Sequence, residues 1–235
     1  MCIRDRTSNT PAGLADFVVP VLARGGLYGL NADTGEPLWQ RWIGFRTRVS
    51  PVVVDETPGA DILVLDEDRN EVLRLAAVDG RLVWPLPLNE PAAAMNLNDG
   101  MIFVSTASGK ILLLNSADGS PVHASKVPQS LVGAAAIDRQ RGIIYQPGEH
   151  SSLFVFDANS MSCTDVYYLG HKPGTVSLPP LVNNGVVFVV ENVGSQAILH
   201  VLRANDAGNG LLPACLLYTS PSPRDATLSR MPSSA

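Results

Sequence analysis

Two carboxylates and an amide, Asp66, Asp68 and Asn70, occupy alternate positions, which is the 1-3-5 ligand spacing of a calcium-binding loop. Such a loop also needs glycine at its sixth position and glutamate at its twelfth, and this chain has Glu71 and Ala77 there. These departures favour a solvated acidic turn between two strands. We therefore expect no metal here, with calcium binding as the alternative.

Histidine and cysteine, the other common metal ligands and catalytic residues, are scattered along the chain. No HxH, HxxxH, CxxC or CxxCH pattern occurs, and neither does a GxSxG elbow or a glycine-rich phosphate loop. The sequence thus identifies no catalytic residue, no disulfide framework and no haem site. The residues concerned are His123, His150, His171, His200, Cys2, Cys163 and Cys215.

The composition is that of a folded chain, with 46% hydrophobic and 17% charged residues among 235. The formal net charge of −5 provides no basic field to hold nucleic acid or anionic lipid. No apolar run approaches the roughly 20 residues needed to cross a bilayer, so we expect no membrane span in this chain.

A ten-residue phrase recurs along the chain and predicts the elements that position all of these residues. It reads LNADTGEPLW at residues 30–39, LAAVDGRLVW at 75–84, LNSADGSPVH at 114–123 and FDANSMSCTD at 156–165, and a partial fifth copy begins at residue 202. The sixth residue of each copy lies at 35, 80, 119 and 161, so the steps are 45, 39 and 42 residues. Repeats of roughly 40–50 residues built from short strands are typical of propeller blades.

Each repeat is predicted to contain four antiparallel strands joined by glycine-containing turns. In the third repeat these are residues 91–97, 101–106, 110–115 and 121–127. The first repeat lacks a recognisable innermost strand, and the fifth lacks its outermost strand. The fold class is therefore all-β, a β-propeller fragment of about five blades, with a β-sandwich as the alternative. The predicted blades are residues 11–45, 46–88, 89–129, 130–172 and 173–212.

The two ends fall outside the repeat. Residues 1–10 and 213–235 share nothing with the repeated phrase, and the second segment is rich in Ser and Pro. Both ends are similar to translated sequencing-adapter read-through, with genuine flexible tails as the alternative. We expect both segments to be non-native or disordered and the chain to be part of a longer protein.

The first phrase resembles the tryptophan-docking repeat of the pyrroloquinoline-quinone-like (PQQ-like) β-propeller family at Thr34, Gly35 and Trp39. Later copies keep parts of the same motif, and His123 and Asp165 replace its tryptophan. The resemblance implies that each repeat tryptophan lies flat between neighbouring blades. It also implies a ring of seven or eight blades, of which this chain would form an open arc. The later motif residues are Asp79, Gly80, Trp84, Asp118 and Gly119.

Enzymatic members of this family are quinoprotein dehydrogenases that hold PQQ with Ca²⁺, a catalytic Asp and a stacking Trp, and several carry a disulfide between adjacent cysteines. This chain has no adjacent cysteine pair. The resemblance therefore favours a non-catalytic interaction scaffold, without cofactor, for a protein or peptide partner. It extends to outer-membrane protein assembly lipoproteins and to propeller domains of bacterial sensor kinases, which implies a periplasmic or extracytoplasmic location. The alternative is a truncated PQQ-dependent alcohol or sugar dehydrogenase.

Overall fold

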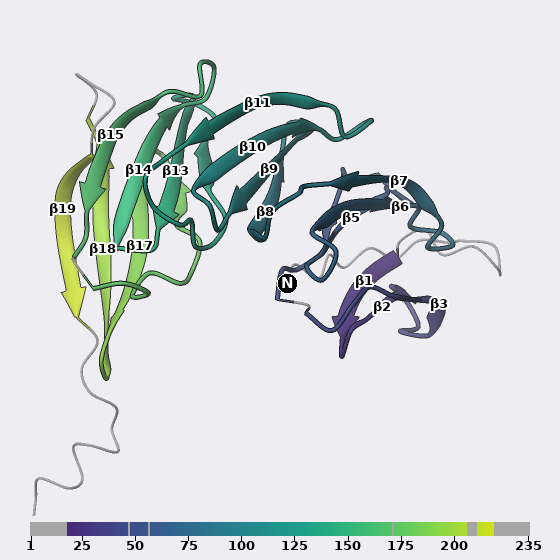
Figure 1. Cartoon of the computed structure of the whole chain (residues 1–235). Helices are drawn as coiled ribbons and strands as arrows, with labels where there is room; N and C mark the ends of the chain where they lie inside the picture. The colour runs from purple at the N-terminus through teal and green to yellow at the C-terminus, as the bar shows by residue number, and fades with distance from the viewer. Residues whose placement is uncertain (1–17, 47, 56, 171, 206–210, 219–235) are drawn as a thin grey trace, which may run out of the picture. The chain divides into compact units, whose positions relative to one another are not determined.

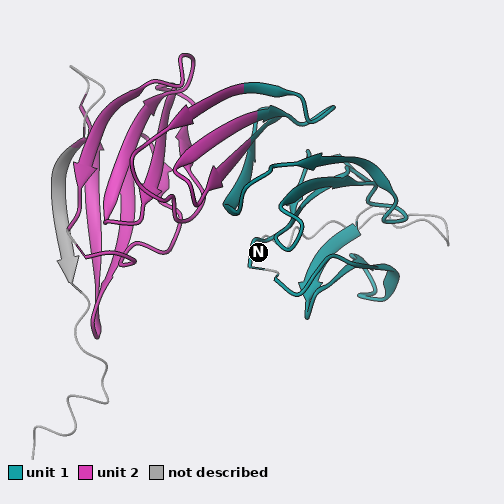
Figure 2. Cartoon of the chain, in the orientation of Figure 1, with its two compact units in different colours: residues 1–102, 114–122 teal, residues 103–113, 123–235 magenta. Residues whose placement is uncertain are grey.

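The computed structural model describes residues 18–46, 48–55, 57–170, 172–205 and 211–218. In these ranges the chain forms strands β1 to β19 and turns, without a helix, which confirms the all-β prediction (Figure 1). No helix that could cross a membrane occurs in the described part of the chain. The chain divides into two compact units, residues 1–102 with 114–122 and residues 103–113 with 123–235 (Figure 2).

The first unit contains two complete antiparallel sheets whose strand order follows the sequence. The first sheet has three described strands, and the second has four. Their bounds are β1 (Val18–Ala23), β2 (Gly26–Asn31) and β3 (Pro37–Trp42), then β4 (Val52–Val53), β5 (Ile62–Asp66), β6 (Glu71–Leu75) and β7 (Leu82–Pro87).

The third sheet has the order β11-β10-β9-β8, and the division into units assigns parts of it to each unit. Its strands lie where the third repeat predicts them. Their bounds are β8 (Ala92–Asn98), β9 (Met101–Thr106), β10 (Lys110–Asn115) and β11 (Pro121–Lys126).

The second unit contains the fourth and fifth sheets, each with four strands in sequence order. The fourth sheet consists of β12 (Ala136–Asp138), β13 (Ile143–Gly148), β14 (Ser152–Asp157) and β15 (Cys163–Tyr168). The fifth consists of β16 (Leu181–Asn183), β17 (Val186–Val193), β18 (Gln196–Ala204) and β19 (Leu211–Tyr218).

Strand β19 corrects the prediction that the fifth repeat lacks its outermost strand. It pairs antiparallel with β18, from Ala204↔Leu211 to Ile198↔Tyr218, and so overlaps the segment predicted as a tail from residue 213. The misreading came from Pro213 and the Ser/Pro-rich composition that follows. Proline is tolerated in an edge strand, because no further strand needs its missing N–H. Residues 1–10 and 219–235 lie outside the described residues.

One backbone irregularity recurs at equivalent positions and shows that the repeats are structurally equivalent. The register shifts by one residue just before Leu30, Leu75, Phe156 and Leu202, in the pairing of the last two strands of four sheets. Each of these residues is the first residue of a copy of the repeated phrase. Such a shift is a β-bulge, which bends the strand and increases its twist.

Each unit has an apolar core formed by neighbouring sheets. In the first unit, residues of β2, β5 and β6 form one buried cluster that includes Leu27, Ile62 and Leu73. In the second, residues of β13, β14, β17 and β18 form another that includes Tyr145, Leu153 and Val189. Every residue of β5 and of β13 is buried, as expected for strands covered on both faces.

Candidate functional site

The predicted calcium loop is the turn between β5 and β6, and Asp66 builds it. The Oδ1 atom of this buried carboxylate accepts the backbone N–H groups of Asp68 (3.1 Å) and Arg69 (2.9 Å). Asn70 closes the turn with a φ of +54°, a left-handed conformation that asparagine tolerates well. An aspartate that satisfies its own turn in this way needs no cation to hold the loop.

Glu67, in the same turn, binds the segment that precedes β4. Its Oε1 accepts the N–H groups of Arg48 (2.5 Å) and Val49 (3.2 Å). Its Oε2 accepts both Nε and Nη2 of Arg48 at 2.8 Å, a two-point contact with the guanidinium group. The Glu67 side chain is only 3% exposed, so these donors replace the water that its charge would otherwise need.

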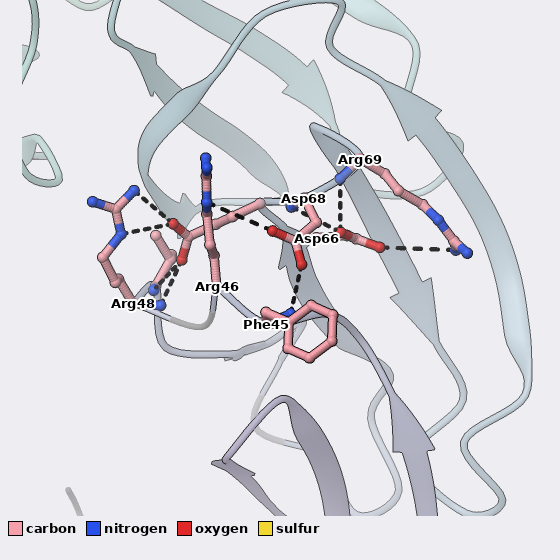
Figure 3. A network of polar contacts seen from close by, with 8 residues as sticks. Phe45, Arg46, Arg48, Asp66, Asp68 and Arg69 are labelled. Atoms are coloured by element: carbon pink, nitrogen blue, oxygen red, sulfur yellow. Dashed lines mark hydrogen bonds and ion pairs between the residues drawn. The ribbon is translucent and has the colours of Figure 1, made fainter.

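Asp68 binds the part of the same segment that precedes Arg48. Its Oδ2 accepts the Phe45 N–H at 2.5 Å, and its Oδ1 lies 3.7 Å from Nε of Arg46 (Figure 3). A Cβ on Gly44 would come within 2.7 Å of this carboxylate, so glycine is required there for the close approach. Three consecutive acidic residues thus each hold a different stretch of backbone.

The structure places Asp66 and Asp68 in one turn but directs their carboxylates to separate N–H donors. Asn70 contributes its backbone carbonyl, which accepts the Leu88 N–H at 2.8 Å. Among the described residues, no group of three or more His, Cys, Asp or Glu side chains is arranged to hold a metal ion. The arrangement suits the clamping of a loop better than the coordination of a cation.

The clamped loop, the end of β3 and the acidic turn carry side chains that the sequence analysis did not single out. Trp42 and Phe45 are 58% and 86% exposed, and their rings meet edge to face with centroids 5.2 Å apart. The side chains of Arg46, Arg48 and Arg69 are 69%, 77% and 74% exposed around the buried carboxylates (Figure 3). The available signal was the segment RWIGFRTR at residues 41–48, which has far more aromatic and basic residues than a linker between repeats requires.

The repeat tryptophans each reach the turn of the following sheet. The half-buried Trp39 donates from Nε1 to the Ala77 carbonyl at 2.6 Å, and a Cβ on Gly80 would lie 2.6 Å from its ring. Trp84 donates from Nε1 to the Ala117 carbonyl at 3.1 Å, with its ring against Gly119. Both contacts lie within the first unit and join consecutive sheets there.

The remaining motif residues build the turns of the repeat. Thr34 Oγ1, Asp79 Oδ1 and Asp118 Oδ1 each accept the backbone N–H two residues further on, at 3.2, 2.9 and 2.9 Å. The N–H of Ser120 beside Asp118 lowers the pKa of that exposed carboxyl. Gly35 takes a φ of +74° in the same turn. These contacts give the motif residues a structural role.

The second unit contains a buried polar network around Glu191. This carboxylate accepts a hydrogen bond from Thr175 Oγ1 (3.0 Å) and is hydrogen-bonded to His200 Nε2 (2.8 Å). The Thr175 and Ser151 hydroxyls are hydrogen-bonded to each other. The Ser151 hydroxyl also donates to the Lys172 carbonyl at 2.6 Å, while His200 Nε2 pairs with Glu191, so the hydrogen bonds of these residues are those of a structural network rather than of a nucleophile–base pair.

Among the described residues, His123 and His150 lie outside this buried network. His123 and His150 are exposed in different sheets and turns, and His171 lies outside the described residues. The network instead fixes the connection between the fourth and fifth sheets.

Comparison with known proteins agrees with this repeat architecture. The family model described as outer membrane protein assembly factor BamB matches residues 23–210. A curated relative of that name from Moranella endobia is 22% identical over 215 residues, which cover 83% of this chain and 55% of the relative. The chain spans about half the length of the curated relatives that it matches.

Solved structures show the same fold. The crystal structure of BamB from Moraxella catarrhalis superposes with a TM-score of 0.61 at 16% identity, over 87% of this chain and 74% of that one. The WD40 domain of Toxoplasma gondii coronin superposes with a TM-score of 0.68 at 10% identity, over 87% and 57%. WD40 repeats form β-propellers, so the likeness identifies these sheets as propeller blades. The chain therefore belongs to the family described as outer membrane protein assembly factor BamB, a family of PQQ-like repeat proteins.

Proposed function

We propose that this chain is part of a non-catalytic propeller scaffold that binds a protein partner during outer-membrane protein assembly, outside the cytoplasm. The observation that carries the proposal is that the acidic turn holds a loop whose aromatic side chain is exposed. In this turn, the Glu67 carboxylate is 3% exposed and accepts hydrogen bonds from two backbone N–H groups and the Arg48 guanidinium of the preceding loop, whereas Phe45 on the same loop is 86% exposed. Rigid loops that present aromatic side chains are typical of binding surfaces.

The chemistry of the described residues supports binding more than turnover. The motif residues build turns and sheet contacts, and the buried network of the second unit bonds to backbone. The net charge of −5 disfavours nucleic acid as a partner. No cofactor is part of the proposal, and no observation on these residues favours the PQQ-dependent dehydrogenase.

Two parallel measurements on the purified chain test the proposal. Biolayer interferometry would measure binding to purified periplasmic domains of an outer-membrane β-barrel assembly machinery. A dye-linked assay with PQQ, Ca²⁺ and a panel of alcohols and sugars would measure oxidation. We expect saturable binding and no dye reduction. Dye reduction would establish the dehydrogenase instead, and lack of binding to every component would refute the assembly role.

A further inference from the structure

We propose that one exposed patch docks an acidic protein segment that carries an apolar side chain beside its carboxylates. This patch, here called the aromatic–arginine surface, consists of Trp42, Phe45, Arg46, Arg48 and Arg69. This inference rests on the proposed function and specifies the chemistry of the partner. It follows from three properties of the surface: exposed rings that contact each other, guanidinium groups with unused donors, and the position of these groups outward of the carboxylates with which they pair.

The aromatic rings are preorganised. Trp42 ends β3 and pairs across the sheet with Gly26, and its ring lies so close to Gly25 that a Cβ there would come within 2.7 Å. The backbone of Phe45 is held through its N–H by Asp68, and the Phe45 ring packs edge to face against Trp42. Two large rings that stay exposed in fixed positions can bury apolar area on binding at little cost in side-chain entropy.

The guanidinium groups keep donors available for a second carboxylate. Arg48 uses Nε and Nη2 for Glu67. Arg46 and Arg69 lie 3.7 and 3.9 Å from their carboxylates, beyond hydrogen-bond distance. Their planar groups can therefore form two-point hydrogen bonds with an incoming aspartate or glutamate.

The exposure of the arginines and the lower exposure of their carboxylates favour an acidic partner. The carboxylates of Asp66, Glu67 and Asp68 are 1%, 3% and 31% exposed, and each is less exposed than the arginine beside it, so the arginines form the outward ends of this surface. The whole chain nevertheless carries a net charge of −5. Screening confines the field of the arginines to about 10 Å at 0.1 M salt, so a short acidic segment that binds at this surface is attracted by them. An extended anionic membrane or nucleic acid would also face the rest of the negatively charged chain and be repelled.

Fluorescence anisotropy with the full chain tests the inference, using a labelled peptide of alternating Glu and Leu/Phe residues as probe. Two matched peptides replace Glu by Lys, or Leu and Phe by Ser. We expect the acidic–apolar peptide to bind at least about tenfold more tightly than either, because removal of an anchoring contact typically has an effect of this size. Binding should weaken between about 50 and 500 mM NaCl.

Variants locate the binding. F45A and R46E should each weaken binding of the peptide by about tenfold or more, with unchanged circular dichroism. The matched controls Y168A and R81E alter an aromatic that is 62% exposed and an arginine side chain that is 74% exposed, both outside the surface, and should change nothing.

The inference is overturned if the wild type shows no saturable peptide binding or if F45A and R46E bind as well as the controls. Tighter binding of phosphatidylglycerol vesicles or single-stranded DNA would also overturn it. Its failure differs from failure of the proposed function: an assembly component that binds wild type and F45A equally leaves the function standing, whereas one that binds neither refutes the function itself.

Discussion

Matched glycine substitutions can measure the contact between a repeat tryptophan and the next sheet. Gly35 and Gly80 occupy the same position of the repeated phrase, with φ of +74° and +69°. A Cβ on Gly35 would meet nothing within 4 Å, whereas one on Gly80 would lie 2.6 Å from the Trp39 ring. G35A therefore reports backbone strain alone, and G80A reports the same strain together with displacement of the indole.

The two costs can be estimated separately. A left-handed alanine costs about 1–2 kcal/mol, and the reduced entropy of the unfolded chain returns about 0.4–1 kcal/mol, so G35A should lower the free energy of unfolding by about 1 kcal/mol. Forcing an extra carbon against Trp39 adds about 1–3 kcal/mol of overpacking. Weakening the hydrogen bond from Trp39 Nε1 to Ala77 adds up to about 1 kcal/mol. G80A should therefore cost about 2–5 kcal/mol.

Urea unfolding followed by far-ultraviolet circular dichroism provides the assay, because this signal does not depend on the tryptophan that is changed. The cycle is completed in a W39A background, where G80A should cost no more than G35A does, since the indole is absent. Equal costs of G35A and G80A in the wild type, or an excess for G80A that persists in W39A, would refute the contact. Unequal m-values would show that the variants also changed the unfolded state.

Three further predictions concern buried polar groups and the acidic turn. The Tyr145 hydroxyl is buried and finds no hydrogen-bond partner in the described part of the chain, so Y145F should keep or raise the urea midpoint. Burial raises the pKa of Tyr145 to about 12, so the phenol loses its proton near pH 10 in the unfolded chain but only at higher pH in the folded one. The free energy of unfolding of the wild type should therefore fall between about pH 10 and 12, and that of Y145F should fall less. E191L should lower the free energy of unfolding by about 1–3 kcal/mol because it leaves His200 without its buried hydrogen-bond partner, and E191Q should cost less by the same urea assay. Calcium at about 1 mM should leave the thermal midpoint unchanged; a rise that D66A abolishes would restore the calcium-loop interpretation.

The strand pattern could be predicted from sequence because its signals are local. Strands β9 and β10 begin and end at the predicted residues 101–106 and 110–115, where apolar runs are bounded by glycine-containing turns. The turns are equally local, since Asn31 Oδ1 accepts the N–H groups of Asp33 and Thr34, only two and three residues away. Repetition of the phrase then extends each local inference to the next sheet.

The candidate binding surface could not be predicted in the same way, because long-range contacts create it. The Phe45 N–H reaches Asp68 across 23 positions of sequence, and Arg48 reaches Glu67 across 19. Nothing in the spacing of these residues encodes either contact. The different environments of Trp39 and Trp42 follow, by contrast, from a local pattern: three positions apart on one strand, they face opposite sides, so one packs on the next sheet and the other is 58% exposed.

The identity of each turn residue depends on the side chain that the preceding sheet presents to it. Where Trp39 and Trp84 reach forward, the turn residue is a buried glycine, Gly80 or Gly119, because a Cβ would press on the ring. The exposed His123 stands in the tryptophan slot of the third phrase, and the turn position of the fourth phrase is Met161.

Met161 keeps the left-handed backbone, with a φ of +53°, but its side chain is 2% exposed. The Ser125 hydroxyl donates to the Met161 carbonyl and supplies the hydrogen bond to this turn that an indole makes at the earlier junctions. The two positions therefore differ together for a steric reason: without the tryptophan ring, a Cβ at the turn position has no ring to meet, and the thioether side chain of Met161 adds apolar burial.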